Sequence, residues 1–161
     1  MGTIAVGDRI PDVELRTMTA DGPRPIGSLE ALGSGRVVLF AVPGAFTPTC
    51  SDYHLPGFVV RAEELRAKGV EKLACVAVND AFVMGAWGSA QNADGEVLML
   101  ADGNGDFARA IGLELDLRAG GLGIRSRRYA AILEDGVVRH LAVEEGGGLE
   151  VSTAEAVLAA L

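Results

Sequence analysis

The sequence has few cysteines and no long uncharged stretch. Cys50 and Cys75 are the two thiols among its 161 residues. Two thiols cannot build a disulfide scaffold, and a chain of this length can bury a sufficient core without one. The longest stretch without a charged residue runs from Val37 to Ser51, which is too short to span a bilayer and is interrupted by Pro43 and Pro48. The sequence therefore excludes a disulfide-rich scaffold and predicts no transmembrane helix.

Positive charge is also scarce. Lys and Arg number 14 against 22 Asp and Glu, which gives a formal net charge of −8. Binding to nucleic acid or to a membrane surface needs clustered basic residues, so we expect neither as a partner. The content of 49% hydrophobic residues excludes intrinsic disorder. Because Met1 to Asp12 lack the basic start and apolar run of a secretory signal, we expect a cytoplasmic protein with one domain over residues 1–161.

Short apolar runs alternate with helical patterns in the first part of the chain. Three of these runs predict buried strands: residues 36–42, 73–78 and 97–101. Between them, Phe58, Ala62 and Leu65 lie on one helical face. Residues 80–93 and 106–111 are weaker helix candidates. Strands joined by helical crossovers predict parallel pairing at the centre of a sheet.

The last part of the chain has a different pattern. The apolar segments Tyr129–Leu133 and Val137–Val143 flank a Glu-Asp-Gly turn, which predicts a hairpin. Ser152 and, three residues later, Glu155 form a capping box for a helix that runs to the last residue. A crossover sheet extended by a hairpin and closed by a helix predicts an α/β, thioredoxin-like fold with a central mixed β-sheet flanked by helices.

The segment from Val42 to Phe58, VPGAFTPTCSDYHLPGF, is the main candidate for chemistry. It follows a predicted strand and leads into a predicted helix, which is where open α/β sheets hold their sites. Cys50 falls at or near the first turn of that helix, where unpaired N–H groups favour a thiolate. Thr47 lies three residues earlier, so its hydroxyl can reach the sulfur. The segment therefore predicts a nucleophilic cysteine.

The same segment contains a family pattern. Pro43, Thr47 and Cys50 stand in the order P-x-x-x-T-x-x-C, and PGAFTPTC is followed by HLPGF. These motifs resemble the peroxiredoxins, in the Prx5 or type II subfamily. The similarity covers nearly the whole chain through four further segments: CVAVNDAFVMGAW (75–87), LADGNGDFARAIGLELDL (100–117), GLGIRSRRYA (121–130) and EGGGLEVS (145–152).

The resemblance implies a thiol peroxidase that reduces hydrogen peroxide and organic hydroperoxides. Cys50 would be the peroxidatic cysteine, which attacks peroxide as a thiolate and becomes a sulfenic acid. Thr47 would hydrogen-bond the thiolate and the peroxide, and Pro43 would shield the sulfenic acid from water. Arg128 matches the family's active-site arginine, whose charge stabilises the thiolate and the departing oxygen. Only the resemblance distinguishes it from neighbouring arginines such as Arg125.

The second thiol, Cys75, lies in the apolar run LACVAV and is predicted to be an inert core residue. Type II members carry a cysteine at the position of Cys75, where it has been considered as a resolving partner. The other family position for a resolving cysteine matches Val151 in this sequence, which has no thiol. We therefore expect an outside thiol to reduce the Cys50 sulfenic acid, which the resemblance identifies as glutathione with glutaredoxin, or as thioredoxin. Two alternatives stay open. Cys75 resolves the sulfenic acid in a thioredoxin-recycled cycle, or the protein is a redox sensor that relays oxidation from Cys50 to a partner.

Other polar signals receive a structural interpretation. His54 follows Cys50 by four residues, so both can share one helical face as nucleophile and base. The resemblance argues against this pair, because the histidine of HLPGF is not the base in that family. The two cysteines and two histidines of the chain, Cys50, Cys75, His54 and His140, lack the paired spacing of zinc ligands, so we expect no metal. We also expect no cofactor, with glutathione as the reducing co-substrate. Residues 144–148 are predicted to be a solvated turn, and the resemblance implies a homodimer.

Overall fold

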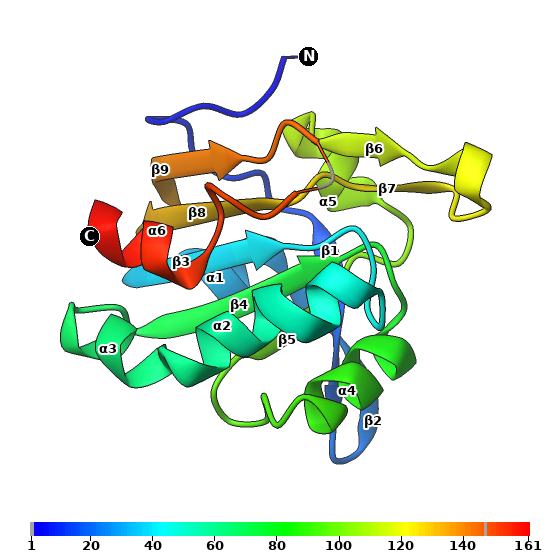
Figure 1. Cartoon of the computed structure of the whole chain (residues 1–161), viewed down its shortest axis with the longest axis horizontal. Coiled ribbons are helices and arrows are strands. Elements are labelled where there is room, and N and C mark those ends of the chain that lie inside the picture. Colours follow the sequence, from blue (N-terminus) through cyan, green and yellow to red (C-terminus); the bar gives the residue numbers. More distant parts are fainter. Residues whose placement is uncertain (1, 147) are drawn as a thin grey trace.

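Three apolar strands lie side by side in the middle of a β-sheet. β3 (Arg36–Ala41), β4 (Lys72–Ala77) and β5 (Leu98–Ala101) pair in parallel, with β4 between the other two. The computed structural model describes residues 2–146 and 148–161, and Figure 1 shows these strands crossing its centre. Most of their side chains are buried, because helices cover both faces of the sheet. The three strands predicted from short apolar runs are confirmed.

Antiparallel strands extend this centre on both sides. β8 (Tyr129–Glu134) pairs with β3 and with β9 (Val137–Val143), which confirms the predicted hairpin. β1 (Glu14–Thr19) pairs with β5 and with β2 (Gly22–Gly27) on the other side. The strand order of the seven-stranded sheet is β2-β1-β5-β4-β3-β8-β9. This mixed sheet confirms the predicted thioredoxin-like fold.

The first hairpin and a small second sheet leave no clear pattern in the sequence. β2 contains Pro23 and Pro25, which lack a donor N–H, and it lies at the sheet edge where this loss is tolerated. β6 (Glu114–Asp116) and β7 (Ile124–Ser126) have three residues each and pair apart from the main sheet. Strands this short have too few residues for an alternating pattern to be recognised.

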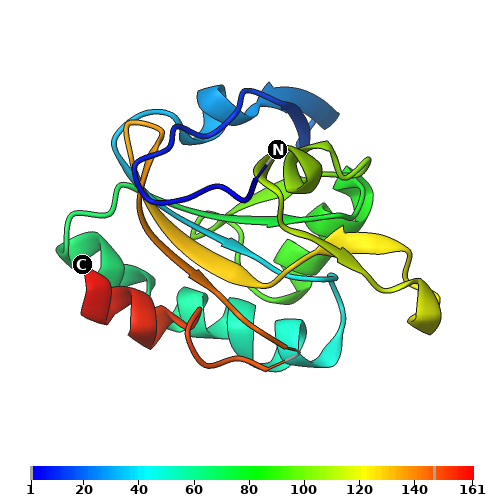
Figure 2. The same cartoon turned by 90° about the horizontal axis from the view of Figure 1, so that it is seen from above.

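Helices form a layer on each face of the sheet. Four helices lie over one face: α2 (Leu55–Val60), α3 (Ala62–Ala67), α4 (Ala81–Ala90) and α6 (Ala154–Ala160). Two lie over the other face: α1 (Ser28–Leu32) and α5 (Asp106–Ile111). Figure 2 shows the sheet between these layers. Phe40 faces the first layer and its neighbour Leu39 faces the second, as the alternation of a strand requires.

The predicted helices are present, with one interruption. α4 and α5 lie within the predicted ranges 80–93 and 106–111. The helix predicted around Phe58 and Leu65 is instead two helices, α2 and α3, because Arg61 leaves the helical backbone with φ −99° and ψ 11°. None of the helices in the described ranges is long and apolar enough to cross a membrane.

The start of α6 differs by one residue from the predicted capping box. The N-cap is Thr153, whose side-chain oxygen accepts from the Ala156 N–H at 3.0 Å. Ser152 does not cap the helix, because its hydroxyl donates to Glu144 Oε2 at 2.7 Å. The Ser152 cap is therefore wrong, and the reason is a long-range contact that the local pattern does not contain.

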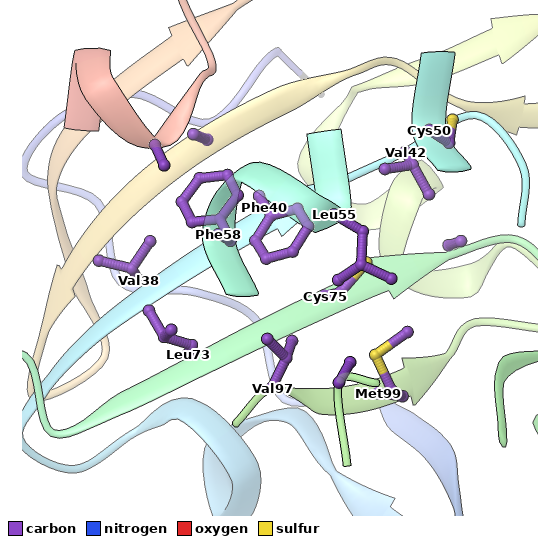
Figure 3. Packing of buried hydrophobic residues seen from close by; sticks show 14 of the residues in the cluster. Val38, Phe40, Val42, Cys50, Leu55, Phe58, Leu73, Cys75, Val97 and Met99 are labelled. Atoms are coloured by element: carbon purple, nitrogen blue, oxygen red, sulfur yellow. The ribbon is translucent and has the colours of Figure 1, made fainter. Parts of the chain in front are cut away.

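Replacing Phe40 with alanine should destabilise the fold. The ring is fully buried and stacks on Phe58, with ring centroids 4.1 Å apart and planes inclined by 7° (Figure 3). The truncation leaves a cavity, so we expect the free energy of unfolding in urea to fall by about 3 to 5 kcal/mol. Val60→Ala, at a side chain that is 80% exposed, is the control and should change it by less than about 0.5 kcal/mol. Equal losses in the two variants would contradict this packing.

Candidate active site

The sheet brings three chain segments together at one end. Ala41, the last residue of β3, pairs with Tyr129, the first residue of β8. Tyr129 also pairs with Val143, the last residue of β9. The segment that follows β3, the residue before β8 and the segment that follows β9 therefore emerge next to one another. The first carries Cys50, the second is Arg128, and the third begins at Glu144.

The loop of residues 43–47 connects β3 to the helix that carries the cysteine. The Ala45 N–H donates to Asn79 Oδ1 at 3.0 Å, which ties the loop to the segment after β4. Phe46 has φ 64°, a left-handed conformation that costs energy for a residue other than glycine. Such conformations persist where the surrounding contacts hold them. The loop thus enters the helix in a defined orientation.

The helix begins at Pro48 and contains one wide turn. Residues Cys50–His54 form a π-helical segment, η1, which α2 continues. Proline suits a first turn because its missing N–H has no partner there in any case. π-helical turns occur often at functional sites. In this turn Cys50 and His54 are both buried, with exposed fractions of 0% and 1%.

Helix α4 braces this turn through its tryptophan. Trp87 Nε1 donates to Ser51 Oγ at 2.9 Å, and the Trp87 side chain is fully buried. Ser51 directly follows the cysteine. The bond therefore fixes the backbone next to Cys50 from a different helix.

Arg128 joins Cys50 to His54. The arginine is 6% exposed, its Nη2 donates to Cys50 Sγ at 3.1 Å, and its Nη1 lies 2.9 Å from His54 Nδ1. A guanidinium has only donors, so His54 Nδ1 is the acceptor. The proton of the neutral ring then sits on Nε2, which donates to the Ser152 carbonyl oxygen at 2.8 Å.

The surroundings of His54 keep its ring neutral. Burial lowers the pKa of His54 from 6.5 to about 4, and the charge of Arg128 acts in the same direction. The hydrogen bond to Ser152 and the charge of Glu144 oppose this shift without cancelling it. Both ring nitrogens are engaged by Arg128 and Ser152, so neither is left for a Cys-His pair.

The neighbouring arginines contact backbone oxygens. Arg125 Nη1 donates to the Pro43 carbonyl oxygen at 3.4 Å, and Arg127 Nη2 donates to the Glu144 carbonyl oxygen at 2.9 Å. Only the third of these arginines, Arg128, donates to a sulfur in the part of the chain that the structure describes. The tertiary structure thus distinguishes three arginines that the residue type alone does not.

Pro43 and Thr47 lie on the loop before the cysteine and are half-buried. The Thr47 hydroxyl donates to the Gly44 carbonyl oxygen at 2.7 Å. Among the described residues, no hydrogen bond joins this hydroxyl to Cys50. Thr47 is therefore paired with its own loop here, while the lone pairs of its oxygen can accept from a bound molecule.

Cys75 lies in the apolar core. It is on β4 opposite Phe40 of β3, and its side chain is fully buried. Figure 3 shows it among packed apolar side chains. Burial raises the pKa of the Cys75 thiol well above its usual value, and nearby Cys50 acts in the same direction. Both cysteines are free thiols, and the predicted core position of Cys75 is confirmed.

The predicted solvated turn at 144–148 is wrong at its first residue. Glu144 is only 5% exposed, and its Oε2 accepts from the backbone N–H groups of residues 150–152, each at 2.9 Å. Burial opposes ionisation, but these bonds and the Ser152 hydroxyl prevail and lower the pKa of Glu144. The rest of the described turn is exposed, and Gly147 lies outside the described residues. A charged residue before a glycine run gives no sign of such burial.

The site combines a buried thiol with a fixed cation. Arg128 Nη2 already donates to the sulfur, while Arg128 Nε is buried and has no hydrogen-bond partner among the described residues. The Nη2 donor can therefore hold a thiolate, an arrangement suited to nucleophilic attack by sulfur. Within residues 2–146 and 148–161, no group of three His, Cys, Asp or Glu side chains is placed to hold a metal ion.

Acid should destabilise the protein through His54. A histidine has a pKa of about 6.5 in an unfolded chain, whereas His54 has a pKa of about 4 in the fold. The unfolded state binds the proton more strongly between these values, so the free energy of unfolding decreases as the pH falls from 6.5 towards 4, by up to about 3 kcal/mol. Urea denaturation at several pH values should show a smaller decrease for His54→Gln than for the wild type. Equal decreases would contradict this account.

Comparisons with known proteins identify the family of the chain. A family model described as Redoxin matches residues 5–158. Peroxiredoxin-2E-2, chloroplastic, from Oryza sativa subsp. japonica is 54% identical over 166 residues, which cover 100% of this chain and 74% of that protein. Peroxiredoxin-2B from Arabidopsis thaliana is 48% identical over 162 residues, which cover 100% of both.

Solved structures show the same relationship. The crystal structure of reduced Prx3 in complex with hydrogen peroxide from Vibrio vulnificus is 54% identical, covers 98% of this chain and 99% of that one, and superposes with a TM-score of 0.94. The resemblance to the peroxiredoxins is thereby confirmed. With a redoxin model over nearly its whole length and relatives of this identity and coverage, the chain belongs to the peroxiredoxin family of thiol peroxidases.

Proposed function

We propose that this peroxiredoxin uses Cys50 as its peroxidatic cysteine to reduce hydrogen peroxide and organic hydroperoxides. The observation that carries the proposal is the environment of Arg128, which is 6% exposed and donates to Cys50 Sγ at 3.1 Å. None of the ion pairs in the described residues includes this arginine. A buried cation without a counter-charge is costly, and a Cys50 thiolate supplies that counter-charge. The hydrogen peroxide in the Vibrio vulnificus structure supports the choice of substrate.

The first half of the cycle transfers one oxygen atom to sulfur. The Cys50 thiolate attacks the hydroxyl oxygen of a hydroperoxide, ROOH, so that an S–O bond forms and the O–O bond breaks. The sulfur loses two electrons and becomes a sulfenic acid, while RO⁻ leaves and takes up a proton to give ROH. Arg128 stabilises the thiolate through Nη2 and offers Nε to the peroxide oxygens. We assign peroxide binding also to Thr47, and shielding of the sulfenic acid to Pro43, because both lie on the loop that leads to Cys50.

The second half of the cycle uses a thiol from outside the protein. Cys75 is fully buried, and burial raises its pKa, so it is a poor nucleophile towards the sulfenic acid. The thiolate of glutathione attacks the Cys50 sulfur, an S–S bond forms and the S–O bond breaks, and the departing hydroxide takes up a proton to give water. A second thiol, from glutaredoxin or glutathione, then releases Cys50. Thioredoxin is the other class of donor, and no resident cofactor takes part in the cycle.

Removing each thiol in turn should give opposite results. Cys50→Ser should abolish the consumption of hydrogen peroxide in the presence of glutathione and glutaredoxin, because no nucleophile remains. Cys75→Ser is the matched control and should leave the rate nearly unchanged. Full turnover by Cys50→Ser would refute the assignment of the peroxidatic cysteine.

Intact mass distinguishes the possible cycles. After one equivalent of hydrogen peroxide the mass should increase by one oxygen, and glutathione should then replace that oxygen with one glutathionyl group. A loss of two hydrogens with no oxygen gained would indicate a Cys50–Cys75 disulfide and contradict the one-cysteine cycle. A mixed disulfide that persists with every small thiol would favour a redox sensor over a peroxidase.

Arg128→Lys should slow the oxidation of Cys50. A single ammonium group cannot reach both Cys50 Sγ and His54 Nδ1 as the guanidinium does. We expect the rate constant with hydrogen peroxide to fall by about 100-fold to 1000-fold, measured by stopped flow through the fluorescence of the single tryptophan. Arg118→Lys, at a side chain that is 74% exposed, is the control and should keep the wild-type rate. Equal rates in the two variants would contradict a role for Arg128.

Assembly and compartment form a further part of the proposal. Phe46, Tyr53 and Phe82 are large and exposed by 56%, 68% and 66%, and the first two lie in the segment that carries Cys50. Exposed aromatic side chains of this kind are typical of surfaces that meet another protein, so we propose a homodimer. The cytoplasmic location stays a prediction, and the Oryza sativa relative is named chloroplastic.

A further inference from the structure

Glu144 has an unusual set of contacts for a residue at the start of a surface turn. Its Oε2 accepts from the N–H groups of residues 150–152 at 2.9 Å each and from the Ser152 hydroxyl at 2.7 Å. Its own N–H donates to the Arg128 carbonyl oxygen at 2.9 Å. One residue thus ties the segment before α6 to the backbone of the arginine that contacts the thiol.

A continuous series of hydrogen bonds leads from this carboxylate to the sulfur. The Ser152 carbonyl oxygen, next to the N–H groups that Glu144 binds, accepts from His54 Nε2 at 2.8 Å. His54 Nδ1 accepts from Arg128 Nη1 at 2.9 Å. The same guanidinium donates through Nη2 to Cys50 Sγ at 3.1 Å. All five side chains are buried, with exposed fractions of 6% or less.

We propose that Glu144 is a positioning residue for the Cys50 thiol, acting through Ser152, His54 and Arg128 without touching the sulfur itself. This inference rests on the proposed role of Cys50. It assigns Glu144 and Ser152, neither of which is hydrogen-bonded to the sulfur, to the positioning of Arg128 beside Cys50.

The His54 ring explains why the position of the Ser152 carbonyl matters. The bond to Ser152 requires the proton on Nε2, and that tautomer leaves the lone pair of Nδ1 for Arg128. If the 150–152 segment moves away, the ring can carry its proton on Nδ1 instead. A donor would then face the Nη1 donor of Arg128, and the guanidinium would lose the contact that holds it beside Cys50.

An effect of the Glu144 charge and an effect of its positioning contacts would change the ionisation of Cys50 in opposite directions. A carboxylate disfavours a nearby thiolate, so if charge alone mattered, removal of the carboxylate would make Cys50 easier to ionise. If Glu144 acts by position, loss of its contacts makes Cys50 harder to ionise, because Arg128 is no longer held at the sulfur. The sign of the change therefore separates the two.

Two variants of Glu144 separate the effect of its charge from the effect of the position of its carboxylate oxygen. Glu144→Gln removes the charge and keeps an oxygen at the same distance from the backbone. Glu144→Asp keeps the charge and withdraws the oxygen by one methylene group. Glu150→Gln and Glu150→Asp are the matched controls, because that side chain is exposed and only its backbone N–H binds Glu144.

The readout is the pH profile of Cys50 alkylation by iodoacetamide, together with the rate of its oxidation by hydrogen peroxide. For Glu144→Asp we expect the midpoint of the profile to rise by about one pH unit and the oxidation to slow by about tenfold or more. Glu144→Gln should stay close to the wild type, and both Glu150 variants should equal it. Cys75 reports on folding, because burial raises the pKa of its thiol in the fold, so a folded variant should take up one alkyl group, at Cys50, and an unfolded variant two.

Three results would overturn the proposal: an unshifted midpoint in a folded Glu144→Asp, a downward shift in Glu144→Gln, or equal shifts in these two variants. If Glu144→Asp does not fold, the Glu144→Gln profile decides alone, since an unshifted midpoint supports position and a downward shift supports charge. The alkylation profile does not involve peroxide, so it tests Glu144 even if Cys50→Ser were to retain turnover. Failure of this inference is therefore distinguishable from failure of the proposed function.

Discussion

The buried guanidinium of Arg128 is the constraint on which the site depends. It is 6% exposed, and no carboxylate pairs with it in the described residues. Its neighbours must therefore be neutral acceptors or carry negative charge, because a second cation in this buried site would be unstable. His54 meets the first condition, since burial and the arginine itself lower its pKa to about 4. The sulfur of Cys50 meets the second when it is ionised. The contact between Arg128 and Cys50 therefore serves both the chemistry of the thiol and the stability of the buried arginine.

The sheet supplies the geometry that this contact needs. Antiparallel pairing places the end of β3 and the end of β9 on either side of the start of β8. Arg128 precedes β8 and so lies between the segment that carries Cys50 and the segment that begins with Glu144. The π-helical turn then buries Cys50 and His54 together. A site assembled from segments far apart in the chain is in this way fixed by the register of three neighbouring strands.

Much of the fold follows from local patterns, and the exceptions have physical causes. Continuous apolar runs are strong signals, so the strands that became β3, β4 and β5 are predictable. The edge strand β2 contains two prolines and the strands β6 and β7 are short, so their local patterns are weak. The cap of α6 moved from Ser152 to Thr153, because Glu144 binds the Ser152 hydroxyl across the loop. Local preference was overruled there by a buried acceptor.

The sequence by itself identified the candidate nucleophile. Cys50 stands with Pro43 and Thr47 in a motif between a strand and a helix, and composition left one other thiol, Cys75, in an apolar run. Only the tertiary structure decided which groups surround the sulfur. Arg128 is distinguished from its neighbours by strand register, and the roles of His54 and Glu144 arise from hydrogen bonds between residues more distant in the chain. The physical reason is that motifs record contacts among residues close in sequence, whereas the environment of a buried charge is set by every segment that packs around it.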